Sequence, residues 1–130
     1  MREIKFRGMD IVNNKWLYGN LEIPLINQSK SKYFIIGYSY GQYQKHEVDP
    51  KTVGQYTGLK DKNGKEIYEG DILYIPSWKR KYKVVFEAGM FRGKSICRWT
   101  ESKVSLATFQ GEVGCKVIGN IYENPELIRT

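Results

Sequence analysis

The chain has 130 residues, a length that suits one compact domain or two very small ones packed together. Hydrophobic residues make up 41% of it and charged residues 27%, which provides for a core and excludes a globally disordered chain. The net charge is +7, and residues 71–104 alone contribute +5, with eight Lys or Arg against three acidic residues. Such a basic segment either binds a polyanion or only keeps the protein soluble.

The sequence predicts a cytoplasmic protein without metal or cofactor. The N-terminal residues lack the apolar segment of a signal peptide, and no stretch approaches the ~20 apolar residues that span a membrane. Cys97 and Cys115 are therefore expected to be reduced. They are too far apart for a CxxC pair, and with the single histidine, His46, they form no recognisable spacing of metal ligands.

The N-terminal region alternates strand-like runs with turns. Residues 4–7 alternate apolar and polar side chains as a half-buried strand does, and residues 16–23 supply the returning strand after an Asn-Asn-Lys turn at 13–15. This pattern predicts an N-terminal β-hairpin. Residues 33–38 are apolar and favour β structure, which predicts a buried strand, whereas residues 39–46 are expected to form a loop.

Turn-forming residues are dense in the centre of the chain. Asp49 is placed to cap one helical turn that begins at Pro50. The Asn-Gly pair at 63–64 predicts a tight turn with two residues of positive φ. Residues 69–71 predict a second turn, which leads into a strand at 72–76, where Pro76 either ends the strand or lies on an edge.

The C-terminal region continues with short strands. We expect strands at 82–87 and 116–122, with an Ala-Gly turn at 88–89. Residues 105–109 form either a weak strand or a short helix, and residues 123–128 are typical of a capped helical turn. No long segment with a period of 3.6 residues occurs.

Short strands and frequent turns together predict a mostly-β fold. We expect a β-rich N-terminal region with the β-hairpin at residues 1–58 and a small barrel at residues 59–130.

Five segments of the sequence resemble the YopX family. They are MREIKFRG at 1–8, WLYG at 16–19, DPKTVGQYTGL at 49–59, DKNGKEIYEGD at 61–71 and VIGNIYENPEL at 117–127. The resemblance runs from the first residue almost to the last, although residues 25–48 and 77–112 carry little of the pattern. It implies a bacteriophage or prophage origin and an SH3-like barrel in the C-terminal half. It implies no established molecular function and no catalytic residues.

The sequence gives little support to catalysis or ion binding. An EF-hand loop starting at Asp61 would need glycine in place of Glu66 and an acidic residue in place of Ile72, so we expect a plain turn. Glu69 and Asp71 are expected to serve the following turn. No glycine-rich phosphate loop and no nucleophile elbow occur. We therefore expect a protein that is not an enzyme.

A basic segment with interleaved aromatic residues is the best candidate for binding. Its cations would contact phosphates, and Trp78 or Tyr82 would stack on a base or sugar. In the alternative interpretation this is a charged loop that keeps an edge strand soluble, with both aromatic side chains folded onto the core. The candidate nucleic-acid-binding residues are Trp78, Lys79, Arg80, Lys81, Tyr82, Lys83, Arg92, Lys94 and Arg98.

The leading interpretation is a non-enzymatic binding or assembly module. Two kinds of partner remain open, nucleic acid at the basic residues and protein, including a second copy of the chain, at aromatic side chains and strand edges. A small enzyme is the remaining alternative.

Overall fold

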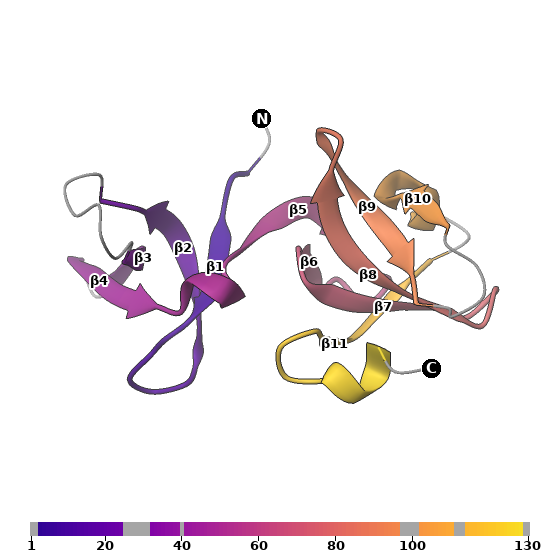
Figure 1. The fold of residues 1–130 in the computed structure, drawn as a ribbon. Helices are drawn as coiled ribbons and strands as arrows, with labels where there is room; N and C mark the ends of the chain where they lie inside the picture. The colour runs from indigo at the N-terminus through magenta and orange to yellow at the C-terminus, as the bar shows by residue number, and fades with distance from the viewer. Residues whose placement is uncertain (1–2, 25–31, 40, 97–101, 111–113, 129–130) are drawn as a thin grey trace. The chain divides into compact units, whose positions relative to one another are not determined.

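The computed structural model describes residues 3–24, 32–39, 41–96, 102–110 and 114–128. Strands dominate these ranges, and the helices in them are short 3-10 turns, which confirms the predicted mostly-β class (Figure 1). The chain divides into two compact units, Met1–Tyr56 and Thr57–Thr130. Among the described helices, none has the length and apolar character needed to cross a membrane.

The first unit is an antiparallel sheet in which β1 to β4 pair in succession and β5 pairs with β1. The predicted N-terminal hairpin is confirmed, with Phe6 opposite Gly19, and Asn14 takes a left-handed backbone in the connecting turn. The strand order is β4-β3-β2-β1-β5. The elements are β1 (Phe6–Met9), β2 (Trp16–Glu22), β3 (Tyr33–Ser39), β4 (Gln42–Val48), η1 (Pro50–Thr52) and the beginning of β5 (Gly54–Lys60).

The expectation of a loop at residues 39–46 is wrong. Strand β4 covers most of this segment and pairs with β3 along its whole length, from Gln42 to Val48. It is the edge strand of the sheet, and every side chain from Gln42 to His46 is exposed. Because neither face of these residues is buried, the sequence lacks the alternation of apolar and polar residues that identifies a half-buried strand.

The helical turn expected at Pro50 is confirmed as η1. Its N-cap is Asp49, whose Oδ1 accepts a hydrogen bond from the Lys51 N–H at 3.0 Å. The Thr52 hydroxyl accepts from the Met9 N–H at 2.9 Å and donates to the Asp49 carbonyl at 2.7 Å. These bonds attach the helical turn to β1.

The second unit contains the rest of β5, a short strand beside it and a five-stranded antiparallel sheet of order β10-β9-β8-β7-β11. Within the described residues no pairing joins β10 to β11, so this sheet is open. The elements are β6 (Glu66–Tyr68), β7 (Asp71–Ile75), β8 (Arg80–Glu87), β9 (Met90–Ser95), β10 (Lys103–Ser105), η2 (Leu106–Phe109), β11 (Lys116–Asn120) and η3 (Pro125–Ile128).

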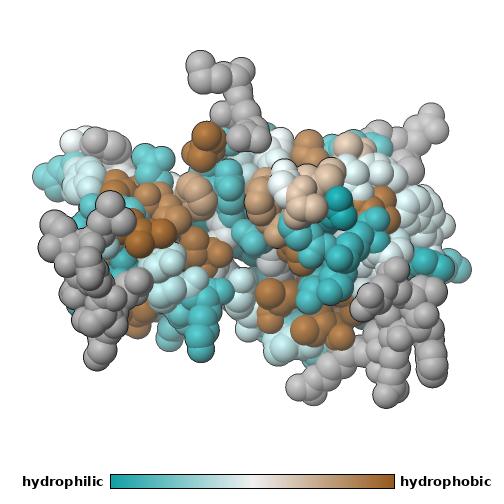
Figure 2. Space-filling model, turned by 45° about the horizontal axis from the view of Figure 1, so that its top comes forward, coloured by the Kyte–Doolittle hydropathy of each residue, from teal (hydrophilic) through white to brown (hydrophobic). Residues whose placement is uncertain are grey.

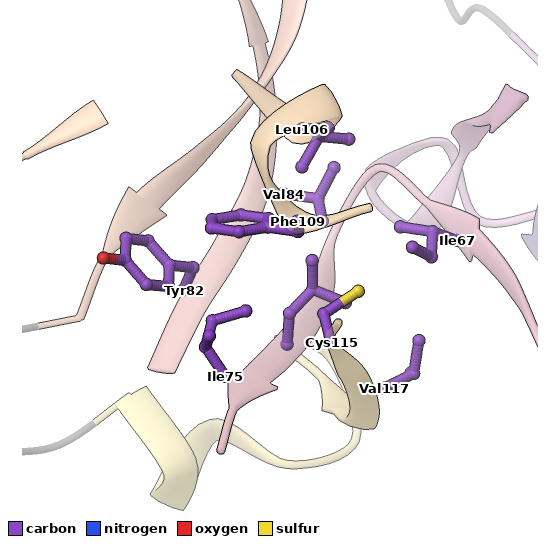
Figure 3. Packing of buried hydrophobic residues seen from close by; sticks show 9 residues of the cluster. Ile67, Ile75, Tyr82, Val84, Leu106, Phe109, Cys115 and Val117 are labelled. Carbon is purple, nitrogen blue, oxygen red and sulfur yellow. The ribbon is translucent and has the colours of Figure 1, made fainter. Parts of the chain in front are cut away.

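The core of the second unit gathers side chains from the sheet, from β6 and from η2 (Figure 3). Burial, with a smaller contribution from the Asp61 charge, raises the pKa of the Cys115 thiol to about 11, which keeps it neutral and unreactive. Cys115 is a free thiol, and Cys97 lies outside the described residues. The core residues are Ile67, Leu73, Ile75, Tyr82, Val84, Leu106, Phe109, Cys115 and Val117.

Gly93 lets η2 approach the sheet. A Cβ atom at this position would lie 2.7 Å from Cε2 of Phe109, which is a core ring that is only 1% exposed. We expect Gly93→Ala to lower the free energy of unfolding by about 1–3 kcal/mol, because the core becomes overpacked. Gly37→Ala is the matched control, since its Cβ would meet only one atom, at 4.0 Å, and should change stability by less than ~0.5 kcal/mol. Urea denaturation measures both, and equal effects would contradict the packing argument.

The expected Asn-Gly turn forms, but with one left-handed residue instead of two. Gly64 has a φ of 82°, whereas the φ of Asn63 is not positive. The turn is organised by Asp61, whose carbonyl accepts from the Gly64 N–H at 3.0 Å. Its Oδ1 accepts from the N–H groups of Asn63 and Lys65, both at 2.9 Å. Its Oδ2 accepts from the Val117 N–H at 3.0 Å, which ties the turn to β11.

These hydrogen bonds give Asp61 a structural role. Burial acts to raise the pKa of its carboxyl group, but the three backbone N–H groups and the charge of Lys65 outweigh burial, so the pKa is lowered. The side chain is a charged carboxylate whose two oxygens already hold backbone donors. The expectation of a plain turn therefore agrees with its geometry.

Candidate nucleic-acid interface

Strands β8 and β9 form a hairpin that brings basic residues together. Its turn, Ala88–Gly89, has positive φ at both residues, 54° and 78°, as the tight two-residue hairpin turn requires. The turn fixes the register of the two strands. In this register Lys83 lies opposite Lys94, and Val85 lies opposite Arg92.

The alternation of side chains along the strands places these cations on the face opposite the core. Tyr82 and Val84 of β8 belong to the core, so the lysines that flank Tyr82 point to the other face. Strand β10 continues the row, because Lys103 lies opposite Lys94. We call this group the basic sheet face; it consists of Lys81, Lys83, Arg92, Lys94 and Lys103.

Glu87 lies among these cations and pairs with Lys103 at 2.8 Å. The hydrogen bond from Lys103 lowers the pKa of the Glu87 carboxyl group, burial opposes this change, and the charges of Lys103, Lys94 and Arg92 lower the pKa further. These three cations therefore lie within electrostatic reach of one carboxylate. Five cations and one carboxylate give this set of side chains a net charge of +4.

The pairing of Lys83 with Lys94 is unfavourable for the fold. Two like charges directly opposite each other on neighbouring strands destabilise a sheet. A polyanion bound to this face would relieve the repulsion.

A pocket of about 340 Å³ adjoins the basic sheet face and shares Lys81 with it. The turn between β7 and β8 forms part of its wall. In this turn the Lys79 N–H donates to the Pro76 carbonyl at 3.3 Å, and Lys79 has a φ of 51°. We call this the basic pocket; it is lined by Tyr74, Lys79, Arg80, Lys81, Ser95 and Ile96.

Two lining residues have further distinctive contacts. The Lys81 Nζ donates to the Leu127 carbonyl at 3.0 Å, which fastens η3 to the sheet. The Ser95 Oγ is buried and has no hydrogen-bond partner among the described groups. A buried hydroxyl of this kind is unusual, because buried polar atoms nearly always find a partner.

The two aromatic candidates differ in their access to a ligand. Tyr82 is only 2% exposed, and its ring centroid lies 5.0 Å from that of Phe109 in the core, so it cannot stack on a base. Its assignment to the binding site is therefore corrected. Trp78 packs edge-on against Phe109, with centroids 5.8 Å apart, and remains 39% exposed. The contact with Phe109 agrees with the alternative interpretation, in which the aromatic side chains fold onto the core. The exposed part of the Trp78 ring still leaves room for a ligand.

The structure brings together most of the predicted cations. Lys81, Lys83, Arg92 and Lys94 lie on the basic sheet face, and Lys79 and Arg80 lie at the basic pocket. Arg98 lies outside the described residues.

Sequence reasoning missed three residues of the site, Tyr74, Ser95 and Lys103. Lys103 is far from β8 in the sequence and joins the face only through the pairing of β10 with β9. Tyr74 and Ser95 line the same pocket because both of their strands pair with β8. The charge of Lys103 was counted in the +5 of residues 71–104, but the sequence did not show that Lys103 lies beside Lys94.

The remaining titratable candidates lie elsewhere. His46 is exposed on β4, and its Nε2 lies 3.4 Å from the Gln44 Oε1. Within the described ranges, no three His, Cys, Asp or Glu side chains come together as a metal site would require.

Comparisons with known proteins agree with the sequence resemblance. A solved structure, described as the crystal structure of protein EF1440 from Enterococcus faecalis, is similar to the chain with a TM-score of 0.61 and 27% sequence identity. The similarity covers 99% of this chain and 100% of that one. A comparison with curated proteins finds no match. The model of the YopX family, described as YopX protein, matches residues 5–129. The expected resemblance is confirmed, and the chain belongs to the YopX family.

Proposed function

We propose that this YopX-family protein is a non-enzymatic binding module that binds nucleic acid through the basic sheet face. The observation that carries the proposal is the register of β8, β9 and β10, which gathers cations from three strands on one face. A row of cations on a rigid sheet contacts a phosphate backbone without ordering long loops. The like-charged pair of Lys83 and Lys94 supports the proposal, since a phosphate between them would offset its cost.

The absence of an enzymatic role is part of the same proposal. It is supported by the Asp61 carboxylate and the Cys115 thiol, two groups of the kinds that catalysis uses. Asp61 accepts three backbone hydrogen bonds, and the pKa of Cys115 is raised to about 11 mainly by burial. A carboxylate with occupied oxygens and a neutral thiol are poor acids, bases and nucleophiles.

Salt dependence is the direct test. If each of the five cations contacts one phosphate, the logarithm of the affinity should fall with the logarithm of salt concentration. We expect a slope of about −3.5 for single strands and about −4.5 for duplexes. Fluorescence anisotropy with labelled DNA and RNA measures both slopes. The proposal fails if none of these probes binds at low salt, or if binding is insensitive to salt.

A protein partner is the second candidate, and a specific observation favours it. Large hydrophobic side chains are exposed on the first unit, and Figure 2 shows apolar patches at the surface. Val12 is 80% exposed and Ile4 57%. Val12 follows Asp10, which bridges to Val48 at the end of β4, and exposed apolar residues beside the edge strand of a sheet suit association with another chain. Light scattering that detects only monomer would count against self-association.

We also propose that the second unit is an SH3-like scaffold. The support is its set of short antiparallel strands packed around one core beneath η2 (Figures 1 and 3). The family resemblance implies a phage or prophage origin, and with it the cytoplasm of a bacterial host as the place where the module binds its partner.

A further inference from the structure

We propose that the basic pocket holds one nucleotide of the bound strand, with its phosphate at Lys79 and Arg80 and its base against Tyr74. This inference rests on the proposed function and adds a site to it. The pocket combines cations and an aromatic ring, and it adjoins the basic sheet face at Lys81. The face would then follow the backbone, while the pocket receives one unit of the chain.

The size of the pocket favours one nucleotide. Its volume of about 340 Å³ lies at the lower end of the range of small-molecule sites, which is about 300–1,000 Å³. An inorganic phosphate alone would leave much of this space empty. A longer segment would have to extend beyond the pocket, onto the neighbouring cations of the sheet.

The cations have complementary geometries for phosphate. The guanidinium group of Arg80 presents a planar fork that matches two phosphate oxygens, and the ammonium group of Lys79 acts as a point charge. Lys81 donates a hydrogen bond to the Leu127 carbonyl, so an anion in the pocket would compete with η3 for its ammonium group. The turn holds Lys79 in a left-handed conformation, with a φ of 51°, which is uncommon for a residue other than glycine. Such conformations concentrate at functional sites.

Ser95 lines the pocket beside Ile96, at the end of β9. It lies opposite Tyr82, so the alternation along the strands directs its side chain to the core face and away from Lys81 and Tyr74. Ser95 therefore contributes to the wall of the pocket, and the charge and the ring come from the other lining residues.

Tyr74 provides the surface for a base. It lies opposite Lys81 in the pairing of β7 with β8, and it is only partly buried, unlike Tyr82. Its ring therefore borders the pocket beside a cation. Stacking of a base on such a ring tolerates every base, so the pocket should accept nucleotides without strong sequence preference.

Nuclear magnetic resonance titration of the full chain tests the proposal with three probes: adenosine 5′-monophosphate, adenosine and inorganic phosphate. We expect the monophosphate to bind more tightly than either other probe and to shift the amide signals of Ser95 and Ile96. Equal binding of monophosphate and inorganic phosphate would reduce the pocket to an anion site and overturn the proposal. The absence of binding by the monophosphate would also overturn it.

Variants separate stacking from charge. Tyr74→Leu should weaken binding of the monophosphate about tenfold, through loss of stacking, and leave inorganic phosphate unaffected. Tyr74→Phe keeps the ring and should retain binding, and Arg80→Gln should weaken both anions. Lys60→Gln lies outside both the pocket and the basic sheet face and is the matched control, which should leave monophosphate binding unchanged. Equal affinities of the Tyr74→Leu variant and the wild type for the monophosphate would contradict stacking.

The two proposals can fail separately. Salt-sensitive binding of strands without binding of the monophosphate removes the pocket as a nucleotide site and leaves the basic sheet face intact. Binding of the monophosphate in the pocket without salt-sensitive binding of strands removes the basic sheet face as a nucleic-acid site and leaves the pocket as a nucleotide site. Short oligonucleotides with and without a terminal phosphate distinguish a strand end from an internal nucleotide.

Discussion

Replacement of Asp61 by alanine is expected to lower the free energy of unfolding by about 3–5 kcal/mol. The substitution removes the acceptor of three backbone N–H groups, those of Asn63, Lys65 and Val117. Hydrogen bonds to a charged group stabilise by about 1.5–3 kcal/mol each, but bonds that share one side chain do not add fully. The loss is large compared with the ~5–15 kcal/mol that keeps a typical domain folded.

Urea denaturation of wild type and variant measures this difference. Asp49→Ala is the matched control, because that side chain caps η1 through a single exposed hydrogen bond, and it should cost about 1 kcal/mol. Asp61→Asn should fall between them, since it retains one oxygen acceptor. If Asp61→Ala cost no more than Asp49→Ala, the turn would not depend on its carboxylate.

The same residue makes stability depend on pH. The pKa of Asp61 is lowered in the folded state from its ordinary value of 3.8, because backbone hydrogen bonds outweigh burial. Its contribution to stability is therefore present above that value and is lost as pH falls through the folded pKa. We expect wild type to lose more stability than Asp61→Ala between pH 7 and pH 3, measured by denaturant titration. Equal losses would contradict this assignment.

Reversal of the charges of Lys83 and Lys94 should weaken binding of single-stranded DNA about 100-fold at low salt. The two residues lie opposite each other on neighbouring strands of the basic sheet face. Each lost phosphate contact removes the gain from counterion release, so the double variant Lys83→Glu/Lys94→Glu should also show a salt slope smaller by about 1.4. Anisotropy titrations at several salt concentrations measure both quantities.

The control must change the charge of the protein equally. Lys51 and Lys60 are exposed and lie outside the basic sheet face, so Lys51→Glu/Lys60→Glu has the same change in net charge. This control should retain most of the affinity, and circular dichroism should show that both variants are folded. Equal weakening by the two double variants would mean that net charge, and not the arrangement on the sheet, drives binding.

Local chemistry made the turns of this fold predictable. Asn14, Gly64 and Ala88–Gly89 have the left-handed backbone that asparagine and glycine favour or that a tight hairpin requires. The strand β4 could not be predicted in the same way, because an exposed edge strand has no buried face to impose a pattern. Its presence depends on pairing with β3, which is a tertiary effect.

The candidate site was only partly predictable for a related reason. The alternation Lys81-Tyr82-Lys83-Val84 already indicated that Tyr82 shares a face with an apolar residue, opposite the two lysines. That signal was sufficient to place Tyr82 in the core. The meeting of Lys94 with Lys103 depends on strand pairing, which no short stretch of sequence specifies.

The hydrogen bond from Lys81 to Leu127 links anion binding in the basic pocket with the release of η3 from the sheet. The same ammonium group borders the basic pocket and holds the carbonyl of η3 at 3.0 Å. An anion that draws this group towards itself weakens the attachment of η3, and release of η3 frees the group for the anion. By thermodynamic reciprocity, each event changes the equilibrium of the other by the same factor. Occupancy of the pocket would therefore be communicated to the C-terminal turn, where hydrogen exchange at η3 would register it.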